Sequence, residues 1–290
     1  MKGPGVVPEE HAVALEPARR RVRALVDGVY VVDSERAVLL FEVGFTPRWY
    51  LPWDDVRADR MTANGRSTDT AARGPARWWD LDTGRRTIDS AAWDHPQTPP
   101  SCPSLRGFVS FEWNVMDAWF QEDEEIRVHP RDPYSRVEAL ASSRHVEIIL
   151  DGTVLADTRS PVVLIETNGP IRYYLPPLDV RRELLVPSDS FTECPDKGRA
   201  SYWHVDVGDL RYHDLFWSYE APFRAVAGIA GHLCAFGEFV DLAVDGELID
   251  RPDTKWAHGG PNAYTWRPGD GAWDPVGAPT WRGDDRGTHR

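Results

Sequence analysis

The chain has few cysteines and no long apolar run. Its three cysteines, Cys102, Cys194 and Cys234, form no CxxC pair, which disfavours a structural zinc site and suits a reducing compartment. No stretch reaches the roughly 20 apolar residues of a membrane-spanning helix, and residues 1–21 lack the apolar run of a signal peptide. We therefore expect a cytoplasmic protein that has no membrane partner.

Positive charge is also scarce. The 290 residues include 33 Lys and Arg against 46 Asp and Glu, which gives a formal net charge of −13. Binding to nucleic acid depends on cationic contacts to phosphate, so this balance predicts that nucleic acid is not a partner. A hydrophobic fraction of 41% and 13 tryptophans indicate a folded chain rather than a disordered one.

An internal repeat is the most informative feature that the sequence does have. Shifted by 124 positions, residues 22–56 align without a gap on residues 146–180, and 13 of the 35 pairs are identical. The same offset aligns further identical tryptophans, Trp79 with Trp203 and Trp93 with Trp217. Solenoid repeats run about 20–50 residues, so a period of this length indicates a duplicated domain.

The repeat sets the domain boundaries that we expect. They are an N-terminal arm at 1–20, a first repeat domain at 21–132, a second at 133–256 and a tail rich in Gly, Pro and Trp at 257–290. Each repeat is long enough to bury a core of its own.

Turn signals at short spacing predict strands rather than helices. Asp27-Gly28 and Asp151-Gly152 each separate two β-prone runs, which is the pattern of a β-hairpin. Further strands are expected at 38–43, 162–167 and 172–175, and residues 223–230 are the best of few helical candidates. We predict a mainly β fold of two similar antiparallel β domains with few short helices.

Several phrases of the second repeat resemble a known family. They are RYYLP at 172–176, TECPDKGRASYW at 192–203, WSYEAP at 217–222 and VDLAVDG at 240–246, preceded by HPRDPY at the junction of the repeats. Over about residues 20–256 the chain resembles the tandem form of the bacterial family called domain of unknown function 427.

The resemblance implies a fold but little about function. It implies a tent-like β architecture, shared with methionine sulfoxide reductase B and the drug-binding domain of cereblon. Many members of that fold hold zinc between two CxxC knuckles, which are missing here, and some bind ligands in an aromatic cage. The family is sometimes labelled nucleotidyltransferase-like, but this chain has neither a Gly-rich phosphate loop nor a paired-carboxylate metal motif.

Residues that differ between the copies are the candidates for chemistry. Cys194, Lys197 and Glu220 occur in the second copy but have no identical counterpart in the first. Cys194 is a candidate nucleophile whose pKa Lys197 could lower, and Glu220 a candidate general acid or base. The competing interpretations are a small, partly buried thiol, a solvated turn lysine and a surface carboxylate.

Aromatic residues of the second copy are candidates for a ligand pocket. They are Tyr174, Tyr202, Trp203, Trp217 and Tyr219, and Arg172 is a candidate anion clamp beside them. Plain core packing is the competing interpretation, and recurrence of Trp203 and Trp217 in the first copy favours it for these two. For Arg172 we favour an internal ion pair with Glu166, because both recur as Arg48 and Glu42.

Together these features predict a small-molecule-binding protein whose site lies in the second repeat. The sequence identifies no reaction and no cofactor, and a homo-oligomer is compatible with this hypothesis. We expect no metal site, since His204 and His213 lack a third ligand in view. The alternative hypothesis is a non-catalytic scaffold whose Trp-rich tail docks onto a protein partner.

Overall fold

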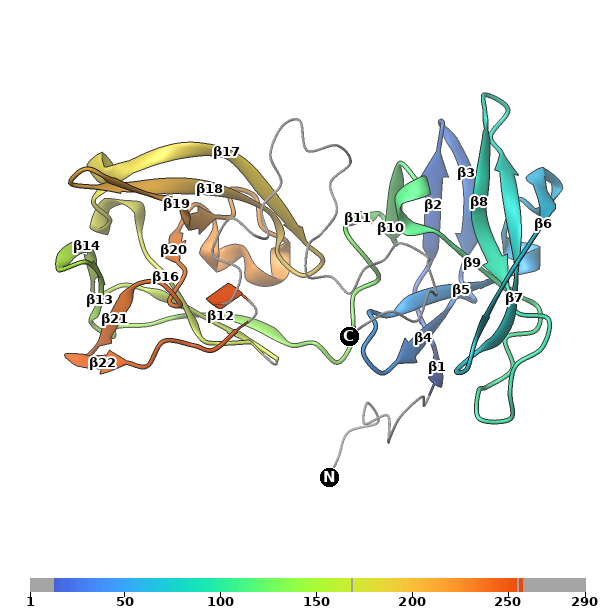
Figure 1. Ribbon diagram of the computed structural model, residues 1–290, viewed down its shortest axis with the longest axis horizontal. Helices are drawn as coiled ribbons and strands as arrows, with labels where there is room; N and C mark the ends of the chain where they lie inside the picture. Colours follow the sequence, from blue (N-terminus) through green and yellow to red (C-terminus); the bar gives the residue numbers. More distant parts are fainter. Residues whose placement is uncertain (1–12, 168, 255, 258–290) are drawn as a thin grey trace. The chain divides into compact units, whose positions relative to one another are not determined.

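The chain folds into two compact units that divide at Asp132 and Pro133 (Figure 1). The computed structural model describes residues 13–167, 169–254 and 256–257. Both units consist mainly of antiparallel strands linked by short 3-10 helices, which confirms the predicted mainly β, antiparallel fold. Within the described residues, no helix combines the length and the apolar character needed to cross a membrane.

The first unit contains two sheets. The larger has seven strands in the order β1 (Val13–Pro17), β4 (Val38–Glu42), β5 (Arg48–Pro52), β9 (Phe108–Phe111), β8 (Thr87–Asp94), β7 (Gly74–Asp82) and β6 (Met61–Thr70). The smaller has four, in the order β11 (Glu124–Ile126), β10 (Ala118–Gln121), β2 (Val22–Val26) and β3 (Val29–Ser34). The 3-10 helices are η1 (Trp53–Asp55), η2 (Ala58–Arg60) and η3 (Trp113–Val115).

The second unit repeats this topology. One sheet has the order β12 (Val137–Ala141), β15 (Val162–Glu166) and β16 (Arg172–Tyr174), and another β17 (Leu185–Cys194), β18 (Gly198–Val207), β19 (Leu210–Ser218) and β20 (Leu233–Ala235). A bridge between Leu175 and Leu233 connects them in the order seen in the seven-stranded sheet. The remaining sheet has the order β14 (Thr153–Thr158), β13 (Val146–Leu150), β21 (Asp241–Val244) and β22 (Glu247–Ile249).

The named helices of the second unit are also 3-10 helices, and two have three residues while the last has six. They are η4 (Pro177–Asp179), η5 (Arg182–Leu184) and η6 (Arg224–Ile229). The segment 223–230, predicted as the best helix, is therefore a 3-10 turn, and Val226 within it departs from helical dihedral angles at φ −124°.

The N-terminal segment is more ordered than the sequence suggested. Val13–Pro17, which we assigned to an arm, forms β1 and pairs with β4, and Val13 is buried. Its repeat counterpart is β12 at Val137–Ala141, which pairs with β15 in the same way. The repeat thus begins nine residues before the stretch that the sequence comparison aligned, where apolar character is retained but identity is low.

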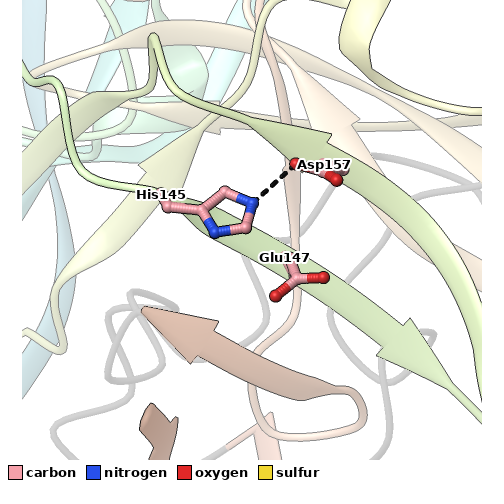
Figure 2. Close-up of side chains that lie close together, drawn as sticks. All are labelled: His145, Glu147 and Asp157. Atoms are coloured by element: carbon pink, nitrogen blue, oxygen red, sulfur yellow. Dashed lines mark hydrogen bonds and ion pairs between the residues drawn. The ribbon is translucent and has the colours of Figure 1, made fainter. Parts of the chain in front are cut away.

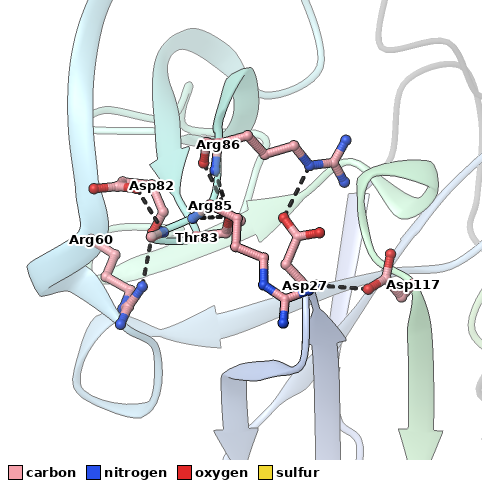
Figure 3. Close-up of polar contacts among 8 residues, drawn as sticks. Asp27, Arg60, Asp82, Thr83, Arg85, Arg86 and Asp117 are labelled. Carbon is pink, nitrogen blue, oxygen red and sulfur yellow. Dashed lines mark hydrogen bonds and ion pairs between the residues drawn. The ribbon is translucent and has the colours of Figure 1, made fainter.

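The Asp-Gly turns form the predicted hairpins. Asp27 and Gly28 have φ of 50° and 80°, and Asp151 and Gly152 have φ of 48° and 76°. Positive φ at both central residues is the tight hairpin geometry that suits right-twisted strands. The first turn is tied to its surroundings by Arg86, which donates to Asp27 at 3.0 Å, and by the Asp27 N–H, which donates to Asp117 at 2.7 Å (Figure 3).

Each unit has a hydrophobic core made of its own residues. In the first unit the largest core cluster packs Trp49, Trp113 and Trp119 among aliphatic side chains. The core of the second unit contains four of the proposed pocket aromatics, namely Tyr174, Tyr202, Trp217 and Tyr219, and Trp256 packs against it. Most of the candidate site residues therefore lie inside this core.

Candidate functional site

The turn between β17 and β18 places a lysine inside the second unit. Lys197 is 8% exposed, and its ammonium group forms an ion pair with Glu166 at the end of β15. The turn is held from behind, because the Phe223 N–H donates to the Lys197 carbonyl at 3.1 Å. Gly198 has φ +98° and a Cβ there would lie 3.4 Å from the carbonyl oxygen of Ala221, so a glycine follows the lysine.

Three further side chains act electrostatically on this ion pair. They are Cys194, Tyr174 and Tyr219, and with Lys197 and Glu166 we call them the Lys197 cluster. Burial by itself would lower the pKa of Lys197, but Cys194, Glu166 and Tyr174 raise it overall, so the lysine stays an ammonium ion. Burial raises the pKa of Tyr174 and of Tyr219 well above the usual value, which keeps both hydroxyls neutral.

The tyrosine hydroxyls of the cluster differ in their hydrogen bonding. The Trp217 Nε1–H donates to the Tyr174 hydroxyl at 2.9 Å, and the rings of Tyr174 and Tyr219 lie 6.5 Å apart between centroids. Tyr219 is 5% exposed, yet its hydroxyl has no hydrogen-bond partner among the described residues. The neighbouring Ser218 hydroxyl is likewise buried without a partner in that part of the chain. Buried polar groups are normally hydrogen-bonded, so the Ser218 hydroxyl is an exception.

Tyr202 and Trp203 are neighbours on β18, but they occupy different faces of it. Tyr202 pairs across the strands with Trp217, and its hydroxyl shares a hydrogen bond of 2.9 Å with Thr192. Burial raises the pKa of Tyr202 to about 12. Trp203 pairs with Phe216 instead, and because successive strand residues point to opposite faces it does not join Tyr202.

Cys194 lies at the end of β17 and is partly buried. Burial raises the pKa of its thiol, and the positive charge of Lys197 only opposes that rise. We expected Lys197 to lower this pKa; the lysine does act in that direction, but the net shift is upward because desolvation dominates. The cysteine of the cluster is therefore a protonated thiol at neutral pH.

Arg172 has a different partner from the one that we expected. Its Nη1 and Nη2 donate to the two carboxylate oxygens of Glu238 at 2.8 and 2.6 Å, and both side chains are buried. The favoured pairing of Arg172 with Glu166 is wrong, because the β17–β18 turn brings Lys197 to Glu166 while the segment after β20 brings Glu238 to Arg172. The guanidinium group also stacks on Trp256 at 5.8 Å.

Glu220 does not join the cluster. It directly follows the buried Tyr219, but it is exposed and forms no hydrogen bond or ion pair within the described part of the chain. The acid–base hypothesis for Glu220 assumed burial beside aromatic side chains, and this environment is absent at its position.

The first unit has an ion pair at the equivalent position, but two of the side chains that surround it differ. Arg73 takes the place of Lys197 and pairs with Glu42 at 3.1 Å. The hydrogen bond from Trp93 to Tyr50, at 3.2 Å, matches that from Trp217 to Tyr174. The other two positions differ between the units: Cys194 corresponds to Thr70 and Tyr219 to His95.

Glu166 is the member of the cluster that sequence analysis did not place there. The signal was present, because Glu42 and Glu166 recur together with a cation at positions 73 and 197. Recurrence of opposite charges at two pairs of equivalent positions predicts a contact, but Arg172 also recurs and offered a competing partner for Glu166.

Comparison with known families agrees with the duplication. A family model described as a domain of unknown function (DUF427) matches residues 14–122 and again residues 138–246. The Lys197 cluster lies wholly within the second match. No curated protein matches the chain.

Proposed function

Because the chain belongs to the DUF427 family as two tandem domains, we propose that its second domain binds a small molecule at the Lys197 cluster. The family carries no assigned activity, so the function has to be argued from the site. The observation that carries the proposal is Tyr219, a side chain that is 5% exposed and whose hydroxyl forms no hydrogen bond among the described residues. It lies in the same cluster as an ammonium group whose one hydrogen-bond partner in those residues is Glu166.

The chemistry of the cluster indicates the kind of ligand. Lys197 and Tyr219 both offer hydrogen-bond donors, so the ligand should present an acceptor oxygen such as a carbonyl or carboxylate. Since Glu166 already neutralises Lys197, a ligand with at most one negative charge fits better than a polyphosphate. The rings of Tyr174 and Trp217 supply apolar contact area for the remainder of such a ligand.

Non-covalent binding is favoured over covalent catalysis. A thiol acts as a nucleophile in its thiolate form, and burial raises the pKa of Cys194. Covalent chemistry at Cys194 stays a prediction with a simple test: if Cys194→Ala retains ligand binding and any turnover, the thiol is not a nucleophile.

The proposal is tested by ligand-induced thermal stabilisation of the full chain. Monocarboxylic acids, amides and nucleotides serve as the panel, and each hit is measured again on Tyr219→Phe and on Tyr50→Phe. Tyr219→Phe removes only the unpartnered hydroxyl, so we expect the basal melting temperature to be kept and the ligand-induced shift to be lost. Tyr50→Phe removes the buried tyrosine hydroxyl that accepts from Trp93 in the first unit, so it serves as the control outside the site and should keep the shift. Equal shifts in wild type and Tyr219→Phe would refute this site.

A further inference from the structure

A histidine and two carboxylates come together on the smaller four-stranded sheet of the second unit. His145 immediately precedes β13, Glu147 lies on it two residues later, and Asp157 lies on β14 (Figure 2). His145 Nε2 is 2.8 Å from an Asp157 oxygen, and one ligand atom from each of the three residues lies within 4.8 Å of the others. These residues are outside the Lys197 cluster.

The strand register places two like charges against each other at this point. Glu147 and Asp157 are directly opposite residues in the antiparallel pair of β13 and β14. Like charges directly opposite are unfavourable in a sheet. The Glu147 carboxylate has no hydrogen bond or ion pair within the described part of the chain, so no protein cation there pairs with it, whereas Asp157 has His145 at 2.8 Å.

In the first unit, opposite charges occupy the equivalent positions. The equivalents of His145, Glu147 and Asp157 are Arg21, Arg23 and Asp33. Arg23 is directly opposite Asp33 in the register, and Arg21 donates to both oxygens of Asp33 at 2.7 and 2.6 Å. The second unit thus differs from its own repeat by replacing two guanidinium groups with an imidazole and a carboxylate, both of which are metal ligands.

We propose that His145, Glu147 and Asp157 bind a divalent first-row transition metal ion, with Zn²⁺ as the probe. One imidazole nitrogen with two carboxylate oxygens suits such an ion, whereas Ca²⁺ and Mg²⁺ prefer oxygen ligands alone. Zinc ligands lie about 2.0–2.2 Å from the metal, so small side-chain rotations would bring the three ligand atoms into a shell. The site departs from our sequence-based expectation of no metal site, which considered His204 and His213.

Calorimetric titration of the untagged, chelator-treated full chain with ZnCl₂ tests the proposal, with MgCl₂ as the comparison ion. We expect Zn²⁺ to bind wild type and to raise its melting temperature, and MgCl₂ to do neither. Loss of a group that only orients a metal ligand weakens affinity about 10- to 100-fold, so Glu147→Gln should lose at least as much. Asp33→Asn, at the position equivalent to Asp157, is the matched control and should bind Zn²⁺ like wild type.

Two further results separate a metal site from an incidental charge cluster. Without metal, Glu147→Gln should be at least as stable as wild type, because it relieves the repulsion from Asp157. Glu147→Arg, which copies the first unit, should fold and fail to bind Zn²⁺. Failure of wild type to bind Zn²⁺, or equal binding by wild type and Glu147→Gln, would overturn the proposal.

Discussion

At the scale of single residues, the molecule buries a cation–carboxylate pair at the same place in both units, with a different cation in each. Arg73 pairs with Glu42 in the first unit and Lys197 with Glu166 in the second. A guanidinium group presents a rigid planar fork, whereas an ammonium group has three rotatable donors on a flexible stem. The change to lysine therefore leaves donors that can turn toward a bound oxygen, which is what the proposed function requires.

Removal of the lysine charge should destabilise the second unit. In Lys197→Met, Glu166 loses its ion-pair partner, and breaking a buried ion pair costs about 3–5 kcal/mol. Because Glu166 is partly exposed, we expect about 3 kcal/mol, the low end of that range. Urea denaturation measures the loss, and Lys197→Arg, which restores the pair of the first unit, should lose much less. Wild-type stability in Lys197→Met would contradict a structural role for the pair.

The thiol of Cys194 should react slowly. Because burial raises its pKa, alkylation by iodoacetamide at pH 8 should be slower than for a free cysteine and should accelerate as the pH rises further. Lys197→Met removes the charge that opposes this rise, so alkylation should become slower still. Peptide mapping by mass spectrometry follows Cys194 separately from the other cysteines. Rapid modification near pH 7 would contradict the protonated thiol.

The sequence predicted some of the site residues correctly and others incorrectly. Lys197 and Tyr219 were identified by comparing the copies and Tyr174 as an aromatic residue of the second copy, and the structure places all three in one cluster. Arg172 was paired with the wrong carboxylate. Charges that recur in both copies indicate which residues form ion pairs, but they do not show which of these residues the fold brings into contact. The exposure of Glu220 agrees with the competing interpretation of a surface carboxylate, although Glu220 adjoins a buried tyrosine.

At the scale of elements, the hairpins are the features that local sequence determines most directly. Asp27-Gly28 and Asp151-Gly152 adopt positive φ at both positions, and strands follow on either side as predicted. β1 was missed because its five residues end at Pro17 and their apolar alternation is too short to stand out. The twisted loop segment containing η6 is held by tertiary contacts such as the Phe223 N–H to Lys197 hydrogen bond, which no local pattern encodes.

Two glycines of the first unit should differ in their tolerance of alanine. A Cβ at Gly28 meets nothing within 4 Å, so Gly28→Ala should cost only the strain of left-handed backbone, about 1 kcal/mol. A Cβ at Gly74 would lie 3.1 Å from the Gln97 carbonyl oxygen, which adds steric strain, so Gly74→Ala should cost about 2 kcal/mol or more. Denaturant midpoints of the two variants test the order, and equal losses would argue against the close approach at Gly74.

At the scale of the whole molecule, each unit should fold by itself. The core clusters contain residues of one unit or the other, and each unit exceeds the size at which a domain can sustain a core. We predict that residues 133–257 expressed alone give a β-type circular dichroism spectrum and a cooperative thermal transition. A chain that stays unfolded would contradict two independent cores. The scaffold alternative rests on the tail at 257–290, of which residues 258–290 lie outside the described residues.

The stability of the molecule should fall at high pH. Burial raises the pKa of Cys234 from 9.0 to about 12, and that of Tyr202 from 10.0 to about 12. Above pH 9 the unfolded chain therefore releases protons that the native state retains, so the free energy of unfolding decreases as pH rises toward 12. Denaturation at a series of pH values measures this slope, and Cys234→Ala should make it shallower. A stability that rises between pH 9 and 12 would contradict the buried, protonated groups.

Small-molecule binding by the second domain at the Lys197 cluster is tested most directly by thermal unfolding of the full chain in the presence of a ligand panel. A ligand at a hundred times its dissociation constant stabilises the folded state by about 2.7 kcal/mol. For a domain of this size we expect that to raise the melting temperature by roughly 5–10 °C for a compound with a carbonyl or carboxylate oxygen and an apolar body. A panel that leaves the melting temperature unchanged throughout would contradict the claim and favour a non-catalytic scaffold.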